Sequence, residues 1–108
     1  MFSEVETILL PGNCITEILP SSFRMNLNLQ FLSLARNQLK TVHNLKHLVS
    51  LQLLDLSNNQ IEAVTDLNEL PANLLSLKFI GNPIEQQAME VGKLSAYRKP
   101  FVLHLIEL

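Results

Sequence analysis

Apolar and polar positions recur in a fixed pattern along most of the chain. Residues 51–61 read L-Q-L-L-D-L-S-N-N-Q-I, so that leucines alternate with other residues just before an asparagine. The four copies are Val5, Ile8, Leu10, Asn13 and Ile15; Leu29, Leu32, Leu34, Asn37 and Leu39; Leu51, Leu54, Leu56, Asn59 and Ile61; and Leu74, Leu77, Phe79, Asn82 and Ile84. The asparagines are 24, 22 and 23 residues apart, a spacing typical of stacked structural repeats, which have periods of roughly 20 to 50 residues.

Each copy predicts one short strand and one set of turns. The alternation before the asparagine has the period of a strand with its leucines on one face. A single strand cannot bury that face, so stacked copies are expected to form a parallel sheet over a continuous apolar core. Between the asparagines, apolar residues recur in steps of three, which predicts short 3₁₀ or helical turns behind the sheet. These residues are Val42, Leu45 and Leu48, and then Val64, Leu67 and Leu70.

The asparagine of each copy follows its strand, where the chain must turn inward. A carboxamide carries both donors and an acceptor, so it can satisfy buried backbone groups that no sheet bond reaches. We therefore predict a structural ladder formed by Asn13, Asn37, Asn59 and Asn82.

With these motifs the chain resembles the leucine-rich repeat proteins, in particular the short-repeat subclass typified by the leucine-rich regulatory subunit of protein phosphatase-1. The subclass pattern L-x-x-L-x-x-L-x-L-x-x-N-x-I-x-x-I is matched from Leu48 to Val64. Residues 97–108, Y-R-K-P-F-V-L-H-L-I-E-L, resemble the C-terminal cap of the same subclass, with departures at Pro100 and Ile106. The resemblance implies an α/β right-handed solenoid with a parallel sheet on its concave face, short 3₁₀ or helical turns on its convex face and a helical C-terminal cap.

We expect one leucine-rich repeat domain over residues 1–108. Its repeats would span about 5–28, 29–50, 51–73 and 74–84, followed by the cap at 85–108. The segment 19–28 is longer than regular, and its Phe23 is expected to point into the core. Residues 1–4 are too few for a cap, so we expect further chain or a partner to cover that end, the alternative being Phe2 lying over it.

The outward positions of the strands predict a protein-binding surface. Three rows face the concave side: Thr7, Phe31, Leu53 and Ser76; Leu9, Ser33, Asp55 and Lys78; and Pro11, Ala35, Ser57 and Ile80. Six of these twelve residues are apolar, whereas a solvated sheet face is mostly polar, and clustered exposed apolar residues usually mark an interaction surface. The predicted binding residues are Leu9, Phe31, Ser33, Arg36, Leu53, Asp55, Leu75, Lys78 and Ile80.

Two readings of this surface remain open. Phe31 and Leu53 form either a hot spot for a partner or a patch covered by an adjacent segment of a longer protein. A face of four strands is roughly 15–20 Å wide, which accommodates one helix or one extended segment of a partner. Asp55 and Lys78, on neighbouring strands, are expected to pair with each other at a solvated surface.

Composition narrows the function classes further. The net charge of −2 is not concentrated in any basic block, so we expect no direct nucleic-acid contact and no membrane-surface patch. No apolar run approaches the length of a membrane span. Cys14 is the single cysteine, which excludes an internal disulfide and favours a reducing compartment. We therefore expect a cytoplasmic protein, with cytoskeletal, ciliary and nuclear locations kept open.

No catalytic or metal signature emerges from the remaining residues. His43 and His47 have a helical ligand spacing, but no third ligand lies nearby in the sequence and solvated convex side chains are the simpler interpretation. Catalysis by Cys14 would need a nearby base, and the three glycines form no phosphate loop. We expect no cofactor and no enzymatic activity.

The leading hypothesis is a non-catalytic scaffold or adaptor that holds another protein on its concave face. The alternatives are a ribonucleoprotein or phosphatase regulatory subunit, and an architectural component of the cytoskeleton, cilium or centrosome that associates with itself. The sequence leaves the oligomeric state open.

Overall fold

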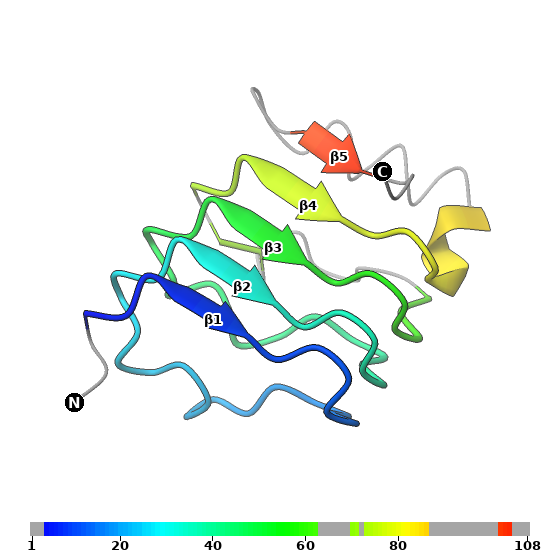
Figure 1. Cartoon of the computed structure of the whole chain (residues 1–108), viewed down its shortest axis with the longest axis horizontal. Coiled ribbons are helices and arrows are strands. Elements are labelled where there is room, and N and C mark those ends of the chain that lie inside the picture. Colours follow the sequence, from blue (N-terminus) through cyan, green and yellow to red (C-terminus); the bar gives the residue numbers. More distant parts are fainter. Residues whose placement is uncertain (1–3, 63–69, 72, 87–101, 105–108) are drawn as a thin grey trace.

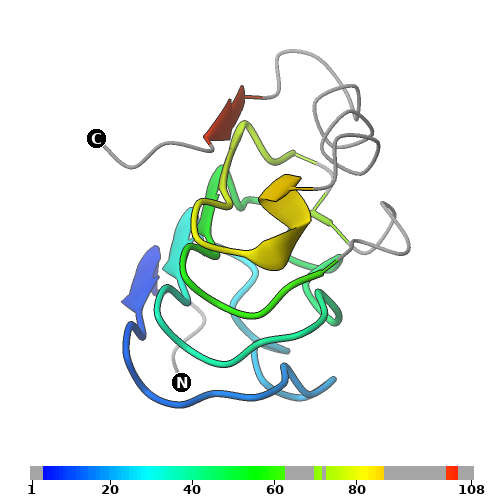
Figure 2. The ribbon, with the colours of Figure 1, turned by 90° about the vertical axis from the view of Figure 1, so that its right-hand side faces the viewer.

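In the computed structural model, which describes residues 4–62, 70–71, 73–86 and 102–104, the repeats stack into one parallel sheet (Figure 1). Its strands follow the chain in order: β1 (Thr7–Leu9), β2 (Phe31–Ser33), β3 (Leu53–Asp55), β4 (Ser76–Lys78) and β5 (Val102–His104). Every neighbouring pair is parallel. The strands stack along one side of the molecule and the connecting turns lie on the other (Figure 2).

The first four strands lie where the alternating leucines predict them. Their register aligns Ile8, Leu32, Leu54 and Leu77 in one row that points into the core. The outward neighbours on either side of this row align as well, so Phe31 pairs with Leu53 and Asp55 with Lys78. The predicted parallel sheet is therefore confirmed.

The predicted helical cap is not confirmed. The described part of segment 85–108 contains the end of a 3₁₀ helix, η2 (Pro83–Gln86), and strand β5, while residues 87–101 and 105–108 lie outside the described residues. Strand β5 pairs with β4 and was not predicted. Its sequence V-L-H-L does not alternate strictly between apolar and polar residues, and the resemblance to a helical cap favoured the other interpretation.

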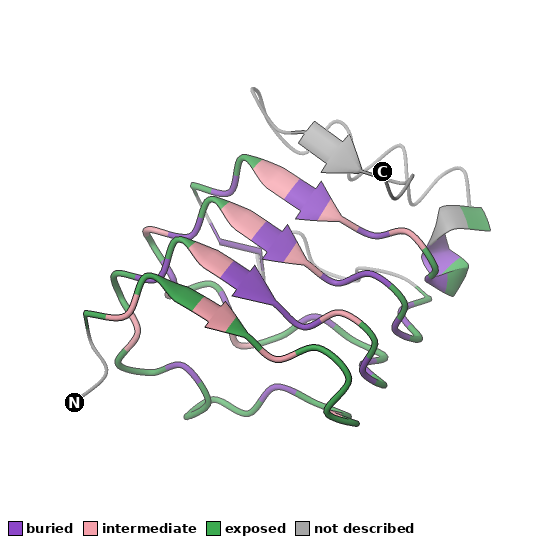
Figure 3. Cartoon of the chain, in the orientation of Figure 1, coloured by how far each residue is buried: buried purple, intermediate pink, exposed green. Residues whose placement is uncertain are grey.

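The core is one cluster of buried apolar residues, and buried positions recur within β2, β3 and β4 (Figure 3). In the second to fourth repeats, the inward-pointing leucines before and within the strands are fully buried, as Leu29, Leu32, Leu51, Leu54 and Leu74 show. Each belongs to the one core cluster that runs through the repeats. Full burial of a leucine stabilises the fold by about 1.5–3 kcal/mol, so stacking of the repeats is the main source of stability.

In the second repeat, the convex side consists of successive tight turns. Leu48 N–H donates to Leu45 C=O and Leu51 N–H donates to Leu48 C=O, and both N···O distances are 3.1 Å. Each bond spans three residues, so consecutive turns place a leucine inward at every third position. Phe23 begins the corresponding series in the first repeat and is buried, as predicted.

Candidate functional site

The asparagines after the strands hold neighbouring repeats together. Asn37 Oδ1 accepts hydrogen bonds from the backbone N–H groups of Asn13 (2.9 Å) and Ile15 (3.0 Å). Its Nδ2 donates to Leu10 C=O in the preceding repeat and to Leu34 C=O in its own repeat, and both N···O distances are 2.9 Å. One carboxamide thus satisfies backbone groups of two turns that the sheet does not reach.

Asn59 and Asn82 repeat this arrangement. Asn59 Nδ2 donates to Leu34 C=O and Leu56 C=O, and its Oδ1 accepts from Leu39 N–H. All three N···O distances are 3.0 Å. Asn82 donates to Leu56 C=O (2.8 Å) and accepts from Ile61 N–H (3.1 Å). All three ladder side chains are buried.

Asn13 differs from the other three. It is exposed, and its Nδ2 donates to Pro11 C=O in its own repeat over 3.2 Å. The ladder bonds of Asn37, Asn59 and Asn82 reach the preceding repeat, whereas among the described residues the Asn13 side chain bonds only within its own turn. The bridging role of Asn13 therefore stays a prediction.

A left-handed backbone position precedes each of these asparagines. Gly12, Arg36, Asn58 and Gly81 have φ of 70°, 57°, 58° and 80°. The chain turns from the sheet into the core at this corner, and the ladder carboxamide follows immediately. Arg36, in the predicted binding set, is thus held at a strained backbone position with its side chain exposed beside the concave face.

The face of the sheet turned away from the core, here called the concave face, carries the predicted rows of side chains. Phe31 and Leu53 lie side by side in the first row, and both are partly buried. Leu9, at the start of the second row, is 60% exposed. No described segment lies over this face (Figure 2), so these apolar side chains meet solvent.

The polar members of the concave face are less available than predicted. Ser33 has an exposed fraction of 7%, so its hydroxyl offers a partner little surface. Asp55 and Lys78 are register neighbours, but no ion pair joins them. Asp55 Oδ1 instead accepts a hydrogen bond from Ser57 N–H over 3.0 Å, two residues further along its own chain. The local turn captures the carboxylate because that contact requires no second flexible side chain to be ordered.

Ile80 and Leu75 flank the concave face. Ile80 lies just after β4 and is partly buried, whereas Leu75 lies just before β4 and is 41% exposed. Leu75 belongs to a row that also contains Gln30 and Gln52, each one residue before its strand. This row borders the concave face along the starts of the strands.

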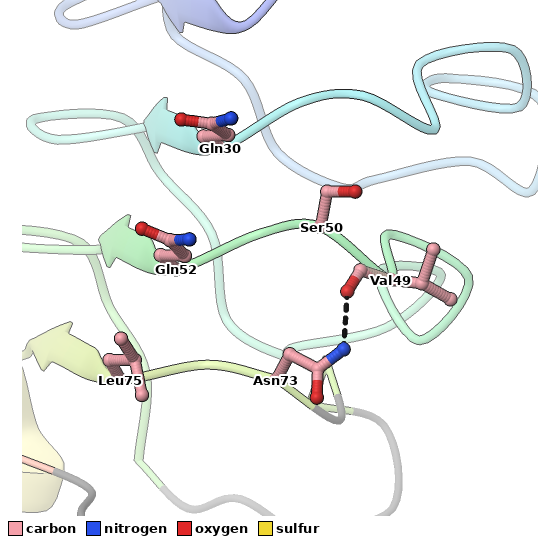
Figure 4. A pocket seen from close by; sticks show the side chains of 6 residues that line it. All are labelled: Gln30, Val49, Ser50, Gln52, Asn73 and Leu75. Atoms are coloured by element: carbon pink, nitrogen blue, oxygen red, sulfur yellow. Dashed lines mark hydrogen bonds between the residues drawn. The ribbon is translucent and has the colours of Figure 1, made fainter.

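A shallow groove of about 450 Å³ runs along this border (Figure 4). Its lining is uncharged, and Asn73 Nδ2 crosses it to donate to Val49 C=O over 2.6 Å. The lining residues are Gln30, Val49, Ser50, Gln52, Asn73 and Leu75. Sequence reasoning found only Leu75 among them, although the glutamines recur at the same repeat position and that recurrence could have signalled the row.

The described residues offer little to catalysis or metal binding. They contain no group of three His, Cys, Asp or Glu side chains that could hold a metal ion. His47 is partly buried, and its Nε2 lies 2.8 Å from Phe23 C=O, so it joins two convex turns instead of being solvated as expected. Cys14 is exposed, with a positive φ of 57°. Within the described ranges, no helix is long and apolar enough to cross a membrane.

Comparison with known families agrees with this geometry. A family model described as leucine rich repeat matches residues 3–61, and a second model of the same description matches residues 50–94. The chain belongs to the leucine-rich repeat family. A search of the curated proteins finds no match. Domains of the leucine-rich repeat family generally mediate protein–protein interaction and are typically non-catalytic.

Proposed function

We propose that this leucine-rich repeat chain is a non-catalytic scaffold or adaptor that binds another protein on its concave face. The observation that carries the proposal is the pairing of Phe31 and Leu53 on an uncovered sheet face, with Leu9 exposed beside them. Large apolar side chains on an open sheet face lose contact with water when a partner covers them, which favours association.

The occupant that fits best is an amphipathic helix lying across the strands. Neighbouring strands are about 4.8 Å apart, close to the rise of about 5.4 Å per helical turn. Apolar residues on successive turns of such a helix would meet Phe31 and Leu53, which are register neighbours, and Leu9 lies one row further along on β1. An extended segment is the alternative occupant.

Lys78 and Arg36 add a charge preference to the proposal. With Asp55 bonded to its own turn, the Lys78 ammonium has no ion-pair partner among the described residues. Arg36 is exposed at the edge of the same face. A partner segment with acidic residues beside its apolar stripe complements both cations, which raises association rate and specificity.

The proposal also covers the subclass of the chain, its location and its lack of direct nucleic-acid contact. Leu48 to Val64 match the short-repeat subclass, and we propose membership of that subclass with a C-terminal cap over residues 85–108. The single cysteine supports a cytoplasmic location. The low net charge supports the absence of direct nucleic-acid contact.

A double variant tests the binding surface. Phe31→Ala with Leu53→Asp is expected to lose the partner recovered by the natural chain in a tagged pull-down read by mass spectrometry. Circular dichroism and melting temperature are expected to stay close to those of the natural chain, because both side chains lie outside the core.

A matched control uses exposed apolar residues away from the sheet. Met25→Ala with Leu27→Asp makes the same two kinds of change at residues that are 59% and 49% exposed, and it is expected to keep the partner. Retention of the partner by the concave-face variant would place the binding surface elsewhere.

A further inference from the structure

The residues that come one position before the strands form a row on one flank of the sheet, here called the flank row. It consists of Glu6, Gln30, Gln52 and Leu75, all of which are exposed. Gln30 N–H donates to Glu6 C=O (2.8 Å), and Gln52 N–H donates to Gln30 C=O (2.9 Å). Gln30 and Gln52 precede strands that are paired on both sides. The exposure of the row therefore belongs to the flank and not to an end of the sheet.

The shallow groove of about 450 Å³ lies along this row (Figure 4). Gln30, Gln52 and Leu75 contribute to its lining from three consecutive repeats. The lining is completed by Val49, Ser50 and Asn73. A groove that extends over several repeats suits a linear chain better than a compact ligand.

The groove offers side chains, and not backbone groups, for hydrogen bonding. Gln52 C=O already accepts from Leu75 N–H (2.8 Å) and Ser76 N–H (3.0 Å). The carboxamides of Gln30 and Gln52, in contrast, have no hydrogen-bond partner within the part of the chain that the structure describes. Each carboxamide carries two donors and an acceptor, which match the C=O and N–H of a peptide backbone. Asn73 Nδ2 makes such a bond in this groove, to Val49 C=O.

The lining also restricts the chemistry of an occupant. None of its six residues is charged or aromatic, while Val49 and Leu75 are 53% and 41% exposed. An ionised group in the groove would lose hydration without gaining a partner. A nucleic acid would find neither cations for its phosphates nor rings for its bases. An uncharged polypeptide segment meets none of these obstacles.

We propose that the groove binds an extended, uncharged segment of another protein. The carboxamides of Gln30 and Gln52 hold its backbone, and Val49 and Leu75 contact its apolar side chains. Strands are about 4.8 Å apart and an extended chain rises about 3.3 Å per residue, so about three residues of the segment reach from Gln30 to Leu75. Alternate side chains of such a segment point to opposite sides, which leaves its backbone within reach of the carboxamides.

Glu6 gives the segment a preferred direction. It continues the flank row beyond Gln30, and its carboxylate has no ion-pair partner among the described residues. A lysine or arginine at this end of the segment would lie beside Glu6 and gain a charge-assisted contact.

The groove goes beyond the proposed binding function, because it selects a different kind of segment. The concave face carries Arg36 and Lys78 and favours acidic residues, whereas the groove favours uncharged residues followed by a cation at the Glu6 end. Either proposal can therefore fail without the other.

Selection from a phage-displayed library of random short peptides on the full chain tests the groove. The enriched peptides are expected to share about three uncharged residues, the length that spans the groove, next to a lysine or arginine. A selection that yields only acidic peptides, only apolar residues in steps of three and four, or no enrichment would overturn the proposal.

Two pairs of glutamines isolate the carboxamide contacts. Gln30→Ala with Gln52→Ala removes both carboxamides from the groove. The matched control is Gln38→Ala with Gln60→Ala, which changes exposed glutamines that follow the ladder asparagines of the same two repeats. Fluorescence anisotropy of an enriched peptide is expected to show binding weakened about tenfold or more by the groove variant, the effect of two lost hydrogen bonds, and unchanged by the control. Equal affinity of the two variants would rule out the groove.

Nuclear magnetic resonance gives a second readout on the unmodified chain. The side-chain amide signals of Gln30 and Gln52 and the methyl signals of Leu75 are expected to shift when an enriched peptide is added. Shifts confined to Phe31 and Leu53 would place the peptide on the concave face and contradict the proposal, whatever the affinity of the variants.

Discussion

At the scale of single residues, the ladder asparagines are the polar groups that the fold depends on most. Asn59 has an exposed fraction of 7%, yet its Nδ2 donates to three backbone carbonyls and its Oδ1 accepts from Leu39 N–H. Aspartate at this position would lack the donors, and leucine would lack both functions. The side chain is therefore specified by the backbone groups around it.

Asn59→Ala leaves these buried backbone groups without partners, at about 1–3 kcal/mol of unfolding free energy. Asn13→Ala is the matched control, because Asn13 is exposed and its side chain donates to one carbonyl of its own repeat. We expect the control to change stability by about 0.5 kcal/mol or less. Chemical denaturation of both variants measures the difference, and similar losses at the two positions would mean that the ladder contributes little beyond the local turn.

At the scale of elements, the strand places fewer requirements on its residues than the corner that follows it. The three-residue strands require only alternation, whereas every corner requires a positive φ. At Gly81 a side chain also lacks space, since an added Cβ would lie 2.8 Å from Cγ and 3.1 Å from Cα of Asn58. At Gly12 the same atom would meet nothing within 4 Å.

Gly81→Ala and Gly12→Ala separate the two costs of the corner. Both variants place a side chain in the left-handed region, which costs about 1–2 kcal/mol. Only Gly81→Ala must also displace Asn58, so we expect it to be the less stable by about 1 kcal/mol or more. Thermal unfolding of the pair tests this, and equal melting temperatures would show that Asn58 moves aside freely.

At the scale of the whole molecule, stability is a sum over neighbouring repeats rather than the property of one centre. The core residues of the second and third repeats are fully buried, while those in and beside β1 are only partly buried. In such an array a repeat with less buried core opens more readily.

Amide exchange is therefore expected to differ between the first repeat and the middle of the sheet. Leu10 and Gly12, bonded to Ser33 and Ala35, are expected to exchange faster than Leu34 and Leu56, which are bonded in the middle of the sheet. The reason is that the core residues beside Leu10 and Gly12 are only partly buried. Uniform exchange across all four residues would instead indicate that the chain unfolds as a single cooperative unit.

The sheet and the core were predictable from sequence because every repeat carries the same pattern of leucines and asparagine. Leu32, Leu54 and Leu77 recur with an asparagine at a constant offset, so four weak local signals reinforce one another. Strand β5 was missed because its segment breaks the repeat. Its place was decided by the free edge of β4, which is a property of the sheet and not of residues 102–104 alone.

The candidate site was predictable in outline but not in detail. Alternation placed Phe31 and Leu53 outward, and the structure has them paired and partly exposed. Alternation could not show that Asp55 accepts from Ser57 N–H instead of pairing with Lys78. Both contacts are within reach of the carboxylate, and the local geometry of the turn selects the first. The groove with Gln30 and Gln52 was missed because glutamine carries no hydrophobic signal.

Sequence by itself determined the period, the inward leucines and the buried asparagines, since apolar burial and backbone hydrogen bonding are required in every repeat. Tertiary structure alone decided the contacts that differ from one repeat to the next. Asn13 is exposed and bonds within its own turn, Asp55 bonds to Ser57 instead of Lys78, and β5 pairs with β4. The physical reason is that these contacts depend on which groups each residue meets, and only the stacking brings those groups together.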